Sequence, residues 1–237
     1  MATEAQEVLA TVGGVRVRRF AGEHALFFES GMTIDADGSP RAYHPALPGR
    51  PSGSPPGLDD LRNAGKPGHW FGVVTDSGKP DGKPVKQGPH DPAPGFFVSA
   101  TALEHRDRPP HDPRRYVDAS TIPYVVLAPE VERRGHARLG DFAMVWNRRN
   151  GKLAHAIFAD VGPADHLGEG SIALARALGM PSDPKAGGQP GGVVYLVFAG
   201  SGNGKPRSAS EIESNGKRLF RAWGGLPRLK KIFPPGS

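Results

Sequence analysis

Short apolar runs separated by glycine and proline constrain the fold of this chain more than any other feature. The 237 residues contain 33 glycines and 25 prolines, which are scattered between the runs. Turns at such short intervals are typical of many strands and few long helices. Six runs have the length and composition of strands: HWFGVVT (69–75), GFFVSAT (95–101), YVVLA (124–128), DFAMVWN (141–147), LAHAIFA (153–159) and GVVYLVF (192–198). We therefore predict a mainly β protein in which these six strands close into one barrel.

Other segments predict the elements around this barrel. VRVRRF and HALFFES, near the start of the chain, are two further candidate strands. SIALARALG has the features of a helix, because Ser171 can cap its start, an apolar stripe follows, and Gly179 can end it. A second helix is predicted from about Ser210 to Trp223, where apolar residues recur at helical spacing. We expect both helices to be peripheral.

The length fits one globular unit and its extension. We predict a barrel region of residues 1–200 and a basic C-terminal extension of residues 201–237, packed on the barrel or tethered to it. The whole net charge of +6 lies beyond Ser201. There, two glutamates face eight bases: Lys205, Arg207, Lys217, Arg218, Arg221, Arg228, Lys230 and Lys231. A solvated helix face is favoured over a phosphate-binding surface, so we expect no nucleic-acid partner.

Several function classes are excluded or weakened by the sequence. With no cysteine, the chain has no disulfides, thiolate metal sites or cysteine nucleophile. GSGNGKP resembles a phosphate loop, but Ala199 and Pro206 stand where that motif needs glycine and Ser or Thr. The nine histidines form no zinc motif, and Ser171 lies outside any GxSxG elbow. No segment approaches the length of a membrane span, and the N-terminal residues lack the features of a signal peptide.

The stretch DVGPADHLGEGS places two carboxylates in a glycine-rich turn. Side chains alternate along LAHAIFAD, so Asp160 ends a small, apolar strand face, and partial burial there raises a carboxyl pKa. Glu169 follows nine residues later, just before the predicted helix, whose dipole favours the ionised form. Two carboxylates with different pKa values suit acid and base catalysis of glycoside hydrolysis. From the residues alone, however, turn and helix capping is the favoured interpretation.

The chain resembles the glycoside hydrolase family 75 chitosanases, in their bacterial form, over about residues 32–202. The resemblance rests on MTIDADGSPRAYHP, LDDLRNAG, GHWFGVV, GFFVSATAL, RYVDASTIPYVVL, GDFAMVWN, AIFADVGPADHLGEGSIALARALG and VVYLVFAGSG. It implies a six-stranded double-psi-type barrel and inverting hydrolysis without metal or cofactor. It also implies that Asp160 and Glu169 are the catalytic pair. A cleft for glucosamine polymers is expected to be acidic.

The resulting hypothesis is an endo-chitosanase that cleaves β-1,4 bonds, with Asp160 as general acid and Glu169 as general base, although the two roles could be exchanged. Candidate substrate contacts are Asp141, the aromatic residues Tyr43, Trp70 and Trp146, and the turn residues Asp35 and Asp37. For Asp141 a turn at the start of the strand is favoured over this role, and for the three aromatic residues core packing is an equal alternative. Asp35 and Asp37 also resemble the start of a calcium loop, whose remaining ligands are missing, and a plain turn is favoured over it.

Two alternatives stay open. A muramidase-like enzyme would cleave the glycan strands of peptidoglycan, and a non-catalytic module would only bind a wall polysaccharide. We expect a polysaccharide partner, no membrane partner and a monomer. The family resemblance implies export from the cell, by a route that the sequence does not identify.

Overall fold

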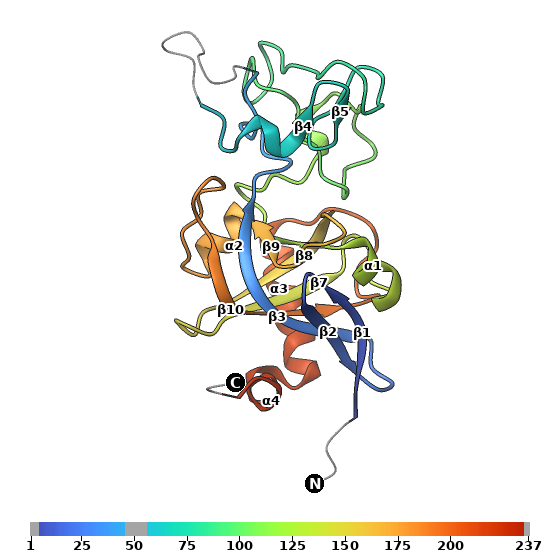
Figure 1. Ribbon diagram of the computed structural model, residues 1–237, viewed down its shortest axis with the longest axis vertical. Helices are drawn as coiled ribbons and strands as arrows, with labels where there is room; N and C mark the ends of the chain where they lie inside the picture. Colours follow the sequence, from blue (N-terminus) through green and yellow to red (C-terminus); the bar gives the residue numbers. More distant parts are fainter. Residues whose placement is uncertain (1–4, 46–55, 235–237) are drawn as a thin grey trace.

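A closed barrel of six strands forms the centre of the protein (Figure 1). The computed structural model describes residues 5–45 and 56–234. Neighbouring strands follow one another around the ring, and the last strand pairs with the first. The order is β3 (Ala25–Asp35), β10 (Gln189–Phe198), β7 (Phe142–Asn147), β8 (Leu153–Val161), β6 (Tyr124–Leu127) and β9 (Glu169–Ser171). Closure satisfies the strand edges that an open sheet would expose, and the predicted barrel is confirmed.

Four of the six predicted barrel strands are correct, and two are wrong. The segments 69–75 and 95–101 lie outside the ring, where β5 (His69–Trp70) pairs only with β4 (Gly65–Lys66). Val74 N donates to Val98 O (2.8 Å), so these segments meet each other instead. Their places in the barrel are taken by β3 and by the three-residue strand β9, which pairs with β3 and with β6.

The described residues between β3 and β6, 36–45 and 56–123, form a loop-rich region at one end of the barrel (Figure 1). It contains β4, β5 and two short 3-10 helices, η1 (Leu61–Ala64) and η2 (Pro113–Arg115). A small apolar cluster of Val74, Val98 and Tyr116 holds part of it together, separate from the main core. Acidic residues of β3, β8 and β9 line a cleft at this end of the barrel, and residues of the loop-rich region form its opposite wall.

The remaining strands and helices surround the barrel. A hairpin of β1 (Gln6–Val12) and β2 (Val15–Phe20) extends the sheet beside β3. The described residues contain four α-helices: α1 (Pro129–Gly135), α2 (Ile172–Ala177), α3 (Ala209–Trp223) and α4 (Gly225–Ile232). Both predicted helices are confirmed, as α2 and α3. Of the described helices, none combines the length and apolar character needed to span a bilayer.

The C-terminal helices lie against the barrel. On α3, Ile212 and Phe220 are buried, and a side chain at Gly216 would collide with His155 of β8, which shows how closely this helix approaches the strand. Leu229 of α4 is buried too. The division of the chain at residue 200 stays a prediction, because these helices share the main hydrophobic core with the barrel.

Candidate active site

Asp160 and Glu169 lie at the same level of the barrel, on the two strands that flank β6. Val126 of β6 pairs with Asp160 on one side and with Glu169 on the other. Neighbouring strands are about 4.8 Å apart, so the two backbones are separated by roughly 10 Å. The strand pairing therefore brings together the two carboxylates that the sequence predicted, with one strand between them.

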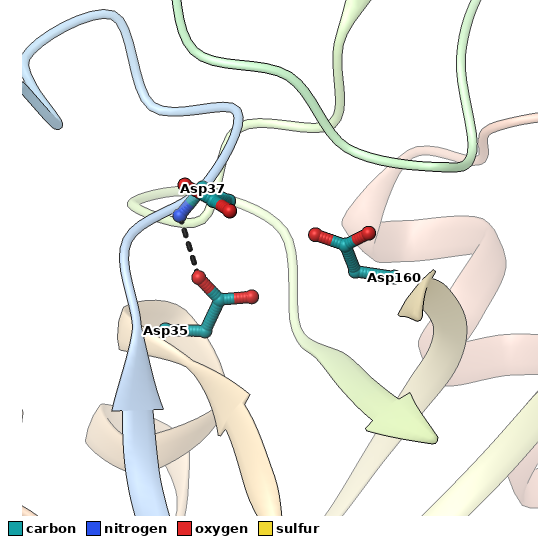
Figure 2. A group of neighbouring side chains, drawn as sticks. All are labelled: Asp35, Asp37 and Asp160. Carbon is teal, nitrogen blue, oxygen red and sulfur yellow. Dashed lines mark hydrogen bonds between the residues drawn. The ribbon is translucent and has the colours of Figure 1, made fainter. Parts of the chain in front are cut away.

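Asp35 and Asp37 bring two more carboxyl groups to the same place. Asp35 ends β3, and its Oδ1 accepts a hydrogen bond from the backbone N–H of Asp37 at 2.7 Å. Figure 2 shows these two residues facing Asp160 across a gap, and one carboxylate oxygen from each of the three lies within 4.8 Å of the others. Three like charges at this distance repel one another, so the group favours holding protons.

Asp160 is fixed by two backbone hydrogen bonds to a single oxygen. The N–H groups of Ala102 and Val161 both donate to its Oδ1, each at 2.9 Å. Burial raises the pKa of Asp160 to about 8, and the charge of Asp35 adds to the rise, while the two backbone donors oppose it. Because Oδ1 is engaged, Oδ2 is the oxygen available to carry a proton toward the cleft.

Glu169 has a different environment from the one predicted. Its carboxyl receives no hydrogen bond from any residue within the described ranges, and burial raises its pKa to about 8, followed by the charges of Asp35, Asp160 and Asp59. The prediction that the helix dipole favours the ionised form of Glu169 is wrong, because Glu169 belongs to β9 and Ser171 caps the start of α2. Burial and like charges outweigh the dipole of this short helix.

The other carboxyl groups at the site are also affected by burial. Burial raises the pKa of Asp35 to about 6. Burial also raises the pKa of Asp37 well above its usual value, with the charges of Asp35 and Asp160 as further causes and hydrogen bonds from Tyr43 and Ser99 opposing the rise. The Ser99 hydroxyl lies 3.1 Å from Asp37 Oδ1. Asp35 is thus the member of the cluster that ionises most readily.

These residues line a cleft of about 780 Å³. Five carboxyl groups face it, those of Asp35, Asp37, Asp59, Asp160 and Glu169. Tyr43 lies in its wall, and the substrate contact predicted for it stays a prediction. No lysine or arginine is found among the described residues that line it, although the chain as a whole carries a net charge of +6. The cleft is therefore suited to a positively charged ligand.

Three predicted substrate contacts lie elsewhere. Asp141 is 0% exposed, and its carboxylate accepts hydrogen bonds from the backbone N–H groups of Arg138, Gly200 and Gly202 at 2.7 to 2.9 Å. These bonds join the start of β7 to the loop after β10. The substrate contact predicted for Asp141 is thus wrong, because its carboxylate is buried among backbone donors.

The two predicted tryptophans also lie outside the cleft. Trp146 is 7% exposed within the main core, with the Arg148 guanidinium 5.8 Å from its ring centre. Trp70 is 8% exposed and borders a neighbouring groove. The structure brings neither indole to the five carboxyl groups, since both pack against the core.

Several residues of the cleft were not predicted from the sequence, among them Asp59, Phe71 and His166. Asp59 lies in the segment LDDLRNAG, which is part of the family resemblance. Its carboxylate accepts hydrogen bonds from Asn63 Nδ2 and from the backbone N–H of Asp60. His166 lies in the loop between the catalytic candidates, with Nε2 3.3 Å from Thr33 Oγ1. Phe71 directly follows the tryptophan that was predicted in its place.

The cluster of Asp35, Asp37 and Asp160 is also the one group within the described residues whose side chains could together hold a metal ion. Calcium takes six to eight oxygen ligands, and this cluster offers one oxygen from each of three residues. We assign no metal to the site, and the expected independence from cofactors stays a prediction.

The closed barrel holds carboxyl groups of raised pKa in an open cleft, and paired carboxyl groups are the groups that most glycoside hydrolases use. The family profile described as fungal chitosanase of glycosyl hydrolase group 75 matches residues 99–223, slightly more than half of the 237 residues. The chain therefore belongs to this family, and it is a chitosanase-like glycosidase. A comparison with curated proteins gave no match. The matched region includes Asp160 and Glu169, whereas Asp35, Asp37 and Asp59 precede it. The bacterial form named by the resemblance stays a prediction.

Proposed function

We propose that the protein hydrolyses β-1,4 bonds within chitosan chains, with inversion at the anomeric carbon. The choice of chitosan as substrate rests on the cleft, which has five carboxyl groups and no lysine or arginine among its described lining residues. Chitosan consists largely of glucosamine units, whose amines become protonated in mildly acidic solution. Peptidoglycan strands carry neutral acetamido groups and carboxyl-bearing side groups, which an acidic cleft attracts less or repels.

Asp160 is the general acid in this proposal. It belongs to the cluster of three aspartates that cannot all ionise together, so a proton is retained near the glycosidic oxygen. The backbone donors at Oδ1 leave the proton on Oδ2. A pKa of about 8 keeps Asp160 protonated at neutral pH, as a general acid requires.

Glu169 is the general base. The charge of Asp160 is one cause of the raised pKa of Glu169, so a protonated Asp160 removes that contribution and Glu169 ionises more readily. With no donor from the described residues, its carboxylate is available to bind water. The position of Glu169 two strands away from Asp160 supports the wide spacing that an inverting enzyme needs for this water.

The reaction then proceeds in one displacement. Asp160 transfers its proton to the glycosidic oxygen as the bond between that oxygen and the anomeric carbon breaks. Glu169 takes a proton from water while the water oxygen bonds to the same carbon from the opposite face. One water is consumed, and the enzyme returns to its starting state when solvent moves the proton from Glu169 back to Asp160.

Three substrates test this proposal against its alternatives. Fully deacetylated chitosan, chitin oligomers and purified peptidoglycan glycan strands are incubated with the protein, and reducing ends are counted. We expect release from chitosan, with the α-anomer as the first product by proton NMR. Turnover of peptidoglycan alone supports the muramidase-like alternative, binding of polymer without turnover supports the non-catalytic module, and a first-formed β-anomer contradicts inversion.

Activated substrates test the two catalytic roles. An aryl glycoside with a good leaving group needs little acid assistance, so Asp160→Asn should recover much of its activity on that substrate. Glu169→Gln should stay inactive on it, because water still needs a base. The reverse pattern exchanges the roles. Asp165→Asn, in the exposed part of the same loop, is the matched control.

A further inference from the structure

Phe71 is an exposed aromatic side chain at the edge of the cleft. Four large hydrophobic side chains are exposed within the described residues, and Phe71, at 73%, is the most exposed of them and the one aromatic. Single exposed apolar side chains are common on protein surfaces, so the position of this ring, and not its exposure alone, is what points to a ligand. The ring lines the catalytic cleft and also borders a second groove, of about 730 Å³.

The backbone on both sides of Phe71 is held in place. Its own N–H donates to Ala64 O at 3.1 Å, and Trp70 N–H donates to Pro80 O at 2.8 Å. On the other side, the Ser99 hydroxyl contacts Gly72 O (3.0 Å) and Asp37 Oδ1 (3.1 Å). The exposed ring is therefore mounted on a hydrogen-bonded segment that is joined directly to the carboxyl cluster.

The second groove begins beside the catalytic acid. Thr101 and Ala102 form part of its wall, and Ala102 is the residue whose N–H donates to Asp160. Phe71 is the one described residue that lines both spaces, so a ligand that leaves the catalytic cleft past this ring reaches the second groove. Two neighbouring binding spaces can hold successive units of a polymer substrate.

The walls of the second groove offer polar groups suited to a sugar. Asp76 is exposed there, and its Oδ1 accepts a hydrogen bond from Lys83 N–H at 2.9 Å, so Oδ2 can receive a donor from a ligand. Glu104 is paired with Arg115 at 2.7 Å, which neutralises its charge. Lys79 adds a positive group, so the groove is mixed in charge and less acidic than the catalytic cleft.

We propose that the polysaccharide runs from the catalytic cleft over Phe71 into this second groove, where it occupies additional sugar-binding subsites. This inference rests on the proposed function and identifies the part of the substrate that lies beyond the cleaved bond. One face of a pyranose ring presents C–H groups, which pack on an aromatic ring. Phe71 would therefore position the chain, and Asp76 would accept a hydrogen bond from an ammonium or hydroxyl group of a more distant unit.

Glucosamine oligomers of increasing length test the inference. We expect the parent kcat/KM to rise with length, and Phe71→Ala to raise the KM for the longest oligomers about tenfold, with kcat within about twofold. Phe71→Tyr keeps the ring and should restore the parent KM. Asp76→Asn keeps the acceptor for Lys83 and should raise the KM only for oligomers long enough to reach it.

The outcomes separate the two proposals. A parent enzyme that cleaves chitosan, together with an unchanged KM for long oligomers in Phe71→Ala, overturns the extended subsites and leaves the proposed function intact. A folded parent that cleaves no glucosamine oligomer overturns the proposed function, and the subsites with it. Urea unfolding of Phe71→Ala shows that the exposed ring is not needed for folding if the midpoint matches that of the parent.

Discussion

Replacing Asp160 by Asn should make the protein more stable at high pH. In the parent, folding raises the pKa of this carboxyl from 3.8 to about 8, so the folded state holds a proton that the unfolded state releases. The free energy of unfolding therefore falls as pH rises between these two values, by up to about 1.4 kcal/mol per pH unit. From pH 4 to pH 7 this amounts to at most about 4 kcal/mol.

The measured gain should be smaller, because Asp35 and Asp37 also have raised pKa values and share the uptake of protons. We expect Asp160→Asn to exceed the parent by about 1 to 3 kcal/mol at pH 8 and by much less at pH 4. The amide oxygen can still accept the bonds from Ala102 and Val161. Urea unfolding followed by fluorescence of the three tryptophans measures the difference at each pH. An equal difference at both pH values, or a less stable variant at pH 8, refutes this reasoning, and Asp165→Asn should show no such pH dependence.

Three further predictions concern other parts of the molecule. Asp141→Asn places an amide NH₂ among three backbone donors and should lower the free energy of unfolding by about 2 to 4 kcal/mol, measured by urea unfolding; unchanged stability contradicts the structural role of this carboxylate. Ser171→Ala removes the cap of α2 and the acceptor for Tyr124 N–H, so it should cost about 2 kcal/mol in the same assay and reduce chitosan hydrolysis through displacement of Glu169. Replacing the exposed bases Lys217 and Arg221 of α3 by Gln should leave hydrolysis of short oligosaccharides within about twofold of the parent and weaken salt-sensitive binding to anionic polymers; a large loss on short oligosaccharides shows that these bases serve the active site.

Much of the barrel could be predicted because four of its strands are apolar runs that are buried at most positions. The runs at 124–128, 141–147, 153–159 and 192–198 are β6, β7, β8 and β10. The alternation in LAHAIFAD also placed Asp160 at the strand end, with the rise in pKa that burial produces there. These features are local, since strand period and strand length suffice to identify them.

The remaining barrel strands depend on partners that the sequence does not specify. β9 is three residues long, EGS, and is extended because it pairs with β3 on one side and β6 on the other. Conversely, HWFGVVT has strand composition, but glycine interrupts it and its partners lie in the loop-rich region. The strand propensity of a segment cannot identify which strand closes a barrel, because closure depends on pairing between segments that are far apart in the sequence.

The site residues that lie at strand ends could be predicted from the sequence. Those whose selection depends on the direction in which a side chain points could not. Asp160, Glu169, Asp35 and Asp37 line one cleft because β3 and β8 end, and β9 begins, at the same end of the barrel. Adjacent residues of an extended segment point in opposite directions, so choosing Trp70 over Phe71 required knowledge of which side the core covers. The sequence contains both rings, and only the packing separates the buried one from the exposed one.

Turnover of fully deacetylated chitosan by the parent and by the two amide variants tests the central claim most directly. The account predicts steady release of reducing ends by the parent. It predicts losses of at least about 10²-fold in kcat for both Asp160→Asn and Glu169→Gln, with Asp165→Asn close to the parent. All four proteins should show folded spectra. A folded parent without turnover, or either amide variant working at the parent rate, contradicts catalysis by this pair of carboxylates.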